Sequence, residues 1–394
     1  MLNQEVYDKV VAKFEALYGA KPAVVSYAPG RIEVLGNHTD YNEGYVFSAA
    51  IDKGTFFAVA PSADDTVEIF ATDIGADGEA WKGSLADVKK VESGATWANY
   101  PLGTFAWLFA GDAKKAGKGF KAVFGGNIPL GAGLSSSAAL EMATALALQK
   151  IYGTSFDKTE LAKIGQKAEH TFAGCPCGLL DQASSMYGQA GALVKSDFRS
   201  NSFESVSMGD GVAFMMVKSN AKHALVDGAY ASRRQACEEA AKYFAQVLRK
   251  PVTHLRDVTM AEWVLYRGGL SETTAKRAVH PIGEDERVLQ GAALLEKGDV
   301  KSFGGLMYDS HESSRNWFEN SCEELDAIVD AAKAIPEVYG ARLSGGGFGG
   351  SCCLLVDPSA ADKISAQITK EYKAKFGDEP VCSVIQASEG AHLV

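Results

Sequence analysis

A strand pattern, a turn rich in glycine and serine, and a long helical pattern follow one another over residues 120–151, and this junction constrains the fold most. Residues 120–124 are apolar and predict a strand, and the Ala/Leu-rich residues 136–151 predict a helix. Gly131 and Gly133 permit close backbone approach to a ligand. Because the first N–H groups of a helix attract anions, the junction predicts a phosphate-binding loop, with an ordinary serine-capped turn as the alternative.

This loop matches neither of the two common nucleotide-binding patterns. A P-loop requires Gly-Lys-Ser/Thr, but no lysine follows Gly133, and the glycine spacing differs from the dinucleotide-binding fingerprint. The formal net charge of −10 provides no long-range attraction for a phosphorylated ligand. Local groups, such as backbone N–H groups, a few cations and Mg²⁺, must therefore supply any affinity for phosphate.

A second polar segment covers residues 29–44 and lies next to an apolar strand pattern. Arg31, His38 and Asp40 fall within it, and convergent donors and acceptors of this kind are what polyol recognition needs. A solvated loop with Asp and Asn turn residues is the alternative interpretation.

Two further segments carry possible functional groups. Glu169 lies late in a helical pattern and Asp181 follows a Gly/Pro/Cys turn, so the two carboxylates could divide metal binding and proton handling; surface carboxylates are the alternative. His170 is interpreted as structural, because nothing at metal-ligand spacing partners it. Five glycines within residues 345–350 predict close contact with a ligand or another loop, because glycine is entropically costly to order.

The length and composition exclude several classes of protein. The 394 residues suggest two domains, and no run of Lys and Arg points to nucleic acid. No segment approaches the length of a membrane span. An odd count of seven cysteines without a CxxC pair argues against a disulfide scaffold and a zinc site, and favours a cytoplasmic protein with reduced thiols. Helix and strand patterns mix without regular βαβ alternation, which predicts an α+β fold, with a helix at the N-terminus and a pair of strands over residues 45–59.

Three of these segments occur in the order of the three motifs of the GHMP kinases, and the chain resembles that superfamily over nearly its whole length. Within it the chain looks most like the galactokinases. Their signature GRxNLIGEHTDYNxG is matched, with two exceptions, by residues 30–44, GRIEVLGNHTDYNEG.

The resemblance implies a two-domain α+β fold with the active site between the domains. A ribosomal S5 domain 2-like first domain is expected over residues 1–190 and a GHMP C-terminal α/β sandwich over residues 191–394. The last strand is expected to return to the first domain. The protein is expected to act as a monomer in the cytoplasm on a small-molecule sugar, with no nucleic-acid or membrane partner.

The implied activity is phosphorylation by MgATP of the anomeric hydroxyl of galactose or a closely related sugar. Asp181 would act as the base toward that hydroxyl or orient it, with Arg31 beside it. Ser137 and Glu169 would hold Mg²⁺. The residues implied at the nucleotide are Trp97 near the adenine, Gly131, Ala132, Gly133, Leu134, Ser135, Ser136 and Ser137 around the phosphates, and Gly346 in support. Those implied at the sugar are Asp40, Gly178 and Tyr230 near O3 and O4, and Asn37 and His38 near O6.

The chain departs from the galactokinase signature at two positions. Asn37 stands where galactokinases carry Glu, and Glu33 stands where they usually carry Asn. Loss of the carboxylate near O6 predicts an altered preference at C6, for example for a 6-deoxy sugar, a uronate or another hexose epimer. A local exchange in which Glu33 and Asn37 compensate each other is the alternative. Two other readings stay open, a GHMP kinase for a different polyol or sugar acid and a catalytically silent sugar sensor.

Overall fold

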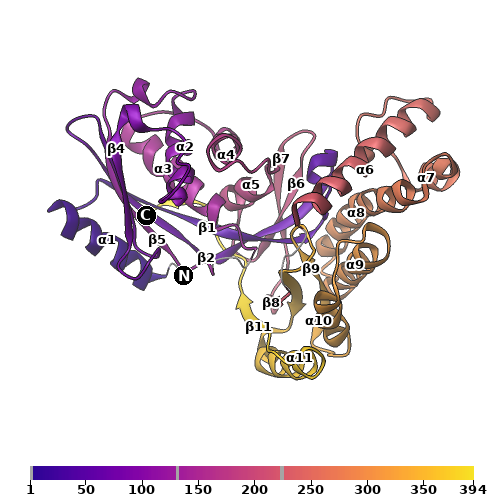
Figure 1. Cartoon of the computed structure of the whole chain (residues 1–394). Helices are drawn as coiled ribbons and strands as arrows, with labels where there is room; N and C mark the ends of the chain where they lie inside the picture. Colours follow the sequence, from indigo (N-terminus) through magenta and orange to yellow (C-terminus); the bar gives the residue numbers. More distant parts are fainter. Residues whose placement is uncertain (1–2, 130–132, 222–225) are drawn as a thin grey trace.

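Two sheets, each covered by helices, form the two lobes of the molecule (Figure 1). The computed structural model describes residues 3–129, 133–221 and 226–394. Over these residues the first lobe contains an eight-stranded sheet and the second a four-stranded sheet. Every strand pair in those ranges is antiparallel except β3 with β5, and the predicted α+β class is thereby confirmed.

The sheet of the first lobe has helices on both faces. Its strand order is β12 (His392–Leu393), β1 (Val24–Leu35), β2 (Tyr45–Pro61), β5 (Phe120–Gly126), β3 (Thr66–Ala71) and β4 (Glu79–Ser84), with β6 (Ala192–Asp197) paired to β2 and β7 (Ser202–Ser207) to β6. Phe57 and Val59 of β2 belong to one apolar core with residues of the four helices α2 (Asn99–Leu108), α3 (Ser136–Tyr152), α4 (Lys158–Ala168) and α5 (Leu180–Tyr187). Phe56 and Ala58 point to the other face, where α1 (Gln4–Tyr18) lies.

The second lobe follows the same rule with a smaller sheet. Its order is β11 (Val381–Ile385), β8 (Ala213–Lys218), β10 (Ser351–Val356) and β9 (Val338–Ser344). Met215 and Val217 of β8 pack beneath α10 (Glu323–Lys333) and α11 (Ala361–Phe376). The remaining helices are α6 (Val226–Val247), α7 (Met260–Tyr266), α8 (Glu272–Glu296) and α9 (Val300–Ser313). Over the described ranges, none of the helices combines the length and hydropathy that crossing a bilayer requires.

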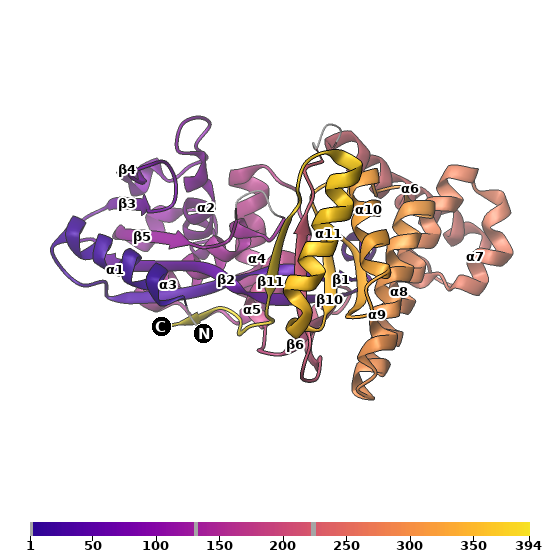
Figure 2. The same cartoon turned by 90° about the horizontal axis from the view of Figure 1, so that it is seen from below.

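The long strands β1 and β2 connect the two lobes. Ile32 and Phe47, near the adjoining ends of these strands, share one apolar core with Phe214 of β8 and Phe303 of α9. Figure 2 shows both strands running from the end of the molecule that carries α1 toward β10 and α9. Residues 29–44, which begin on β1, therefore lie at the junction of the lobes.

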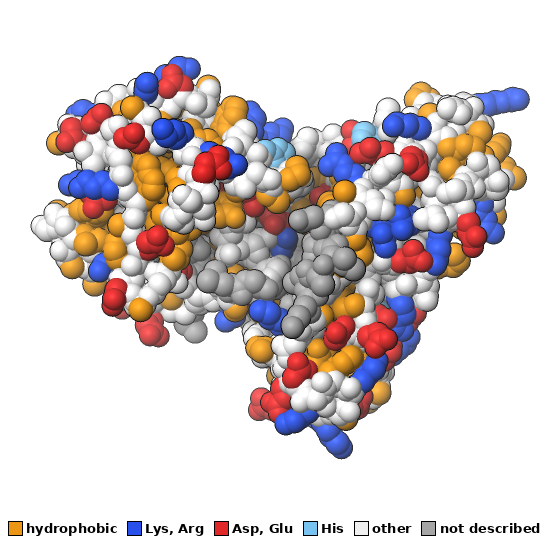
Figure 3. Space-filling view, viewed as in Figure 1, with side chains coloured by type: hydrophobic (Ala, Val, Ile, Leu, Met, Phe, Trp, Pro, Cys, Tyr) orange, Lys and Arg blue, Asp and Glu red, His pale blue; other side chains and the backbone are white. Residues whose placement is uncertain are grey.

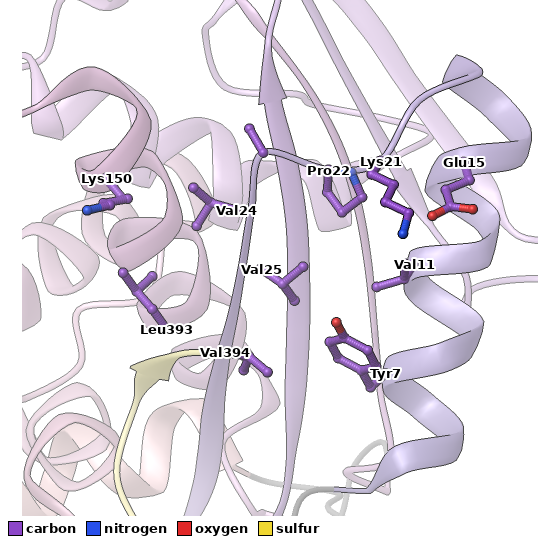
Figure 4. Close-up of a pocket in the computed structure, with 11 residues that line it drawn as sticks. Tyr7, Val11, Glu15, Lys21, Pro22, Val24, Val25, Lys150, Leu393 and Val394 are labelled. Carbon is purple, nitrogen blue, oxygen red and sulfur yellow. The ribbon is translucent and has the colours of Figure 1, made fainter.

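The C-terminal strand returns to the first lobe, as expected. Ser26 of β1 lies opposite Leu393 of β12, and Val394 N–H donates to the Val25 carbonyl at 2.9 Å. Leu393 and Val394 line a cavity of about 400 Å³ together with Tyr7 and Val11 of α1 (Figure 4). Because β6 and β7 also pair into the first sheet, sheet pairing ties residues beyond position 190 to this lobe, and the boundary at 190 stays a prediction.

The prediction of two strands over residues 45–59 is wrong, because one strand runs through Gly54 without a turn. A Cβ at position 54 would lie 2.4 Å from the Ala28 carbonyl oxygen and 2.5 Å from the Tyr27 ring. The glycine therefore permits close contact with β1 rather than a chain reversal.

Candidate active site

Close packing of β1 on the loop before α3 brings the first two motifs together. A Cβ at Gly30 would lie 2.4 Å from the Leu134 carbonyl oxygen, and the N–H of the next residue, Arg31, donates to that oxygen at 3.1 Å. Glycine at position 30 is therefore needed for this contact. The Arg31 side chain consequently projects from β1 directly beside the start of α3.

Arg31 meets Asp181, which lies in the first turn of α5. The Arg31 guanidinium donates from Nε to Asp181 Oδ1 at 2.7 Å, and Nη2 lies 2.6 Å from the same oxygen. Nη1 donates to the Gly133 carbonyl at 2.8 Å, and the Ser135 hydroxyl donates to Asp181 Oδ2. The two residues predicted to carry the chemistry are thus in contact, and both are tied to the loop before α3.

The start of α3 presents groups that suit an anion. Ser135, with φ 54°, precedes the helix and makes no side-chain cap. The first N–H groups of the helix have no intrahelical partner, and the Ser136 and Ser137 side chains are partly exposed beside them. Of the predicted phosphate loop, Gly131 and Ala132 lie outside the described residues.

Glu169 ends up in a buried polar cluster at the end of α4. Its Oε2 accepts from Gln182 Nε2 at 2.8 Å and from the Cys177 thiol at 2.9 Å. Oε1 accepts no hydrogen bond from the described residues. It is also absent from the side-chain oxygens that are both fully buried and without a hydrogen-bond partner. Gln182 also donates to Glu141, whose pKa is raised well above its ordinary value by burial and then by Glu169. Burial therefore disfavours the charged form of Glu141, and Glu169 keeps one oxygen available.

A polar cavity of about 630 Å³ opens on the other side of Asp181, between the lobes. The space-filling view shows the molecule hollowed at this junction (Figure 3). The volume is within the usual range of small-molecule sites. The cavity is lined by Arg31, Glu33, Asn37, His38, Asp40, Gly174, Cys175, Pro176, Cys177, Gly178, Leu180, Asp181, Tyr230, Ala231, Gly345 and Gly346. All five residues predicted to contact the substrate lie in this lining.

Asp40 and Gly178 form one wall of the cavity. A Cβ at position 178 would lie 2.2 Å from Asp40 Oδ2, so glycine there leaves room for the carboxyl. Burial, followed by the neighbouring Glu33, raises the pKa of Asp40 to about 6, and Asp181 adds to the effect. A carboxyl held in this way is an acceptor whose charge the protein disfavours.

The hydrogen-bonding groups of His38 are already engaged within the protein. The His38 ring donates from Nε2 to the Gly346 carbonyl at 3.1 Å and accepts at Nδ1 from the Tyr41 hydroxyl at 2.9 Å. Burial first, with Arg342 and Arg233 adding to it, lowers the pKa of His38 to about 4, so the ring is neutral at pH 7. The glycine-rich residues 345–346 thus pack against the polar segment of β1.

A network of buried charged residues stabilises the polar segment of β1, and it was not predicted from the sequence. Arg342, completely buried on β9, donates from Nη1 to Glu33 Oε1 at 3.1 Å. Glu284 on α8, also fully enclosed, accepts from the Gly36 and Asn37 N–H groups at 2.8 Å each and pairs with Arg287 at 2.6 Å. The sequence carries one signal of this network, which is a charged residue within an apolar strand pattern. Arg342 is such a residue in the buried strand Val338–Ser344.

Trp97 lies away from the cavity. Trp97 lies in the turn just before α2. Its indole N–H donates to Glu79 Oε2 at 3.0 Å, and its ring centre lies 5.3 Å from that of Phe124. Its position near an adenine stays a prediction, as do the nucleotide roles of Ser136, Ser137 and Gly346.

Three family models match the chain. The GHMP kinases N terminal domain covers residues 99–189, the GHMP kinases C terminal domain covers residues 292–374, and the galactokinase galactose-binding signature covers residues 12–61. The signature spans β1 and the polar segment that lines the cavity.

Solved structures agree with these matches. Lactococcus lactis galactokinase, crystallised with galactose, is 29% identical, with 98% of this chain and 99% of that chain covered and a TM-score of 0.89. Methanococcus jannaschii mevalonate kinase is 18% identical over 93% of this chain and 98% of its own, with a TM-score of 0.60. Homoserine kinase from Cytophaga hutchinsonii is 16% identical over 94% of this chain and 97% of its own, with a TM-score of 0.57. The last two show a shared fold alone.

Proposed function

Since the chain belongs to the GHMP kinase superfamily and resembles galactokinase, we propose that it transfers the γ-phosphoryl group of ATP to the anomeric hydroxyl of galactose or a closely related sugar. The observation that carries the proposal is the contact between Arg31 and Asp181. This pair separates a polar cavity of sugar size from the exposed start of α3. An acceptor in the cavity and a phosphate at the helix would meet at the pair.

Asp181 is placed to receive or orient the proton of the acceptor hydroxyl. Oδ1 is held by Arg31 and Oδ2 by Ser135, and a carboxylate oxygen can accept a second hydrogen bond from a sugar hydroxyl. Arg31 keeps the carboxyl fixed and places a permanent positive charge where negative charge builds up during transfer. Phosphoryl transfer depends mainly on such positioning and charge balance.

The chain offers fitting groups for MgATP. The uncapped start of α3 supplies N–H groups for phosphate oxygens, with Ser136 and Ser137 beside them. Glu169 Oε1, which lacks a donor among the described residues, and the Ser137 hydroxyl are hard oxygen ligands of the kind Mg²⁺ accepts. Mg²⁺ held by these groups would supply positive charge that offsets the charge of the phosphates. No group of three or more His, Cys, Asp or Glu side chains suited to a metal occurs in the described ranges, and Ser137 and Glu169 are the residues that would hold Mg²⁺ in this proposal.

A silent sugar sensor is the rival from another class. Loss of the acidic residue or of the serine loop would favour it. Here all three are present, and Asp181 contacts both Arg31 and Ser135, which favours an enzyme. The monomeric state and the cytoplasmic location stay predictions.

The test is a coupled assay of ADP release with purified protein, MgATP and a panel of hexoses. We expect galactose-dependent release that Asp181→Asn slows by at least about a hundredfold. The matched control is Asp8→Asn, because Asp8 is an exposed carboxylate on α1 away from the cavity. A wild-type protein that binds sugar without releasing ADP would identify a sensor and overturn the proposal.

A further inference from the structure

The amide of Asn37 has no proton left for a substrate. Its Nδ2 donates to Glu33 Oε1 and to the Gly345 carbonyl, both at 2.8 Å. Its Oδ1 accepts from Asn320 Nδ2 at 3.0 Å. Since an amide nitrogen has two protons, both are used within the protein. Asn37 therefore acts as a brace between β1 and the glycine-rich loop.

Glu33, by contrast, has an open oxygen. Its Oε1 accepts from Asn37 and from Arg342, at 2.8 and 3.1 Å. Oε2 accepts no hydrogen bond from the described residues. It is also absent from the side-chain oxygens that are both fully buried and without a hydrogen-bond partner. Since Glu33 lines the cavity and 7% of its side chain is exposed, the open oxygen is the part that the cavity reaches.

Glu33 lies one sugar length from the reacting pair. Residues 31–33 pair regularly with residues 48–50 of β2, so Arg31 and Glu33 point to the same face of β1. Two residues of strand rise separate them by about 6.6 Å. A single pyranose ring with its anomeric hydroxyl at Asp181 would therefore bring its opposite end to Glu33.

We propose that Glu33, braced by Asn37 and Arg342, accepts a hydrogen bond from a hydroxyl at the end of the sugar opposite the anomeric carbon, and so selects neutral hexoses with a C6 hydroxyl. The inference rests on the proposed sugar kinase activity and names the group that selects its substrate. The carboxylate absent from position 37 is supplied from position 33, so the two departures from the signature compensate each other.

The charges of the cavity exclude a uronate. The described lining residues carry three carboxylates, Glu33, Asp40 and Asp181, against one guanidinium, Arg31. Arg342 lies behind Glu33 without reaching the cavity lining and is already paired with it. A carboxylate on the substrate would add a fourth negative group at short range. A 6-deoxy sugar would instead leave Glu33 Oε2 facing an apolar methyl group, which a site built for a hydroxyl rejects.

The test compares galactose, 6-deoxygalactose and galacturonate with wild-type protein and Glu33→Gln. We expect the wild type to prefer galactose over 6-deoxygalactose by about tenfold or more in kcat/KM, and to use galacturonate least. Glu33→Gln should lower kcat/KM for galactose on the order of tenfold, equivalent to about 1.4 kcal/mol, leave 6-deoxygalactose nearly unchanged, and raise kcat/KM for galacturonate. General damage to the fold cannot produce opposite changes for two sugars. Glu5→Gln, an exposed glutamate on α1, is the matched control.

A reciprocal exchange provides a second measurement. The double variant Glu33→Asn with Asn37→Glu returns the carboxylate to the galactokinase position and should restore the preference for galactose over 6-deoxygalactose. Equal losses with galactose and 6-deoxygalactose in Glu33→Gln, or a wild-type preference for galacturonate, would overturn the assignment while leaving the kinase activity intact. Absence of ADP release with every hexose would instead overturn the proposed function.

Discussion

Replacement of Asp40 by Asn should stabilise the protein at neutral pH while weakening sugar binding. The Asp40 carboxyl is enclosed beside Glu33 and Asp181, and its pKa is raised from 3.8 to about 6. The difference of about 2 pH units corresponds to about 3 kcal/mol for keeping the group ionised in the folded protein. Because Asp40 opens onto the cavity, solvent screening reduces the expected gain to about 1–3 kcal/mol.

The sign of the pH dependence distinguishes this cause from others. Between about pH 4 and pH 6 the folded protein binds more protons at Asp40 than the unfolded chain does, so the contribution of this group to stability falls as pH rises. The gain of Asp40→Asn over wild type should therefore be full at about pH 7.5 and about a third as large at about pH 4.5. The titration of His38, lowered to about 4, acts on both proteins and cancels in the difference.

Urea unfolding of both proteins at the two pH values measures this difference, and the KM for galactose measures the functional loss. We expect KM to rise about tenfold, because an amide replaces a charged acceptor. A loss of stability of equal size at both pH values would show that Asp40 has a structural role. The argument from its enclosed charge would then be refuted.

Three further results are expected. Asp181→Asn should lower kcat on the order of 10²- to 10⁴-fold with the sugar KM changed only a few-fold, as measured by coupled ADP release. Glu284→Ala should cost about 3–5 kcal/mol in urea unfolding, because it leaves Arg287 and two backbone N–H groups without their partner, whereas Glu284→Gln should cost less. Glu169→Gln should raise the Mg²⁺ concentration needed for half-maximal activity, and an unchanged Mg²⁺ dependence would remove Glu169 from the metal site.

Parts of the fold that depend on neighbouring residues could be predicted from the sequence. The Ala-rich pattern of α3 and the glycine–serine turn before it are determined within one segment, and the structure places the helix at Ser136–Tyr152. The twofold alternation within β3 and the short apolar run of β8 are equally local. Gly54 misled the prediction for β2, because the contact that requires a glycine comes from β1 rather than from its own chain neighbours.

The site depends on contacts between distant segments, and these set the limit of prediction. Arg31 and Asp181 are 150 positions apart, and only the resemblance to a known family paired them. Glu33 and Arg342 are 309 positions apart. The sequence marks both as unusual, one as a departure from the signature and the other as a charge in an apolar strand. It does not show that they meet, so compensation between Glu33 and Asn37 could be named only as an alternative.

Phosphorus NMR of the product tests the central claim most directly. After incubation of the protein with MgATP and galactose, the account predicts a new phosphate resonance coupled to the anomeric proton, which wild type forms and Asp181→Asn forms at least about a hundredfold more slowly. A phosphate on any other hydroxyl, or the same product formed by Asp181→Asn at the wild-type rate, would contradict the assignment of Arg31 and Asp181 as the reacting pair.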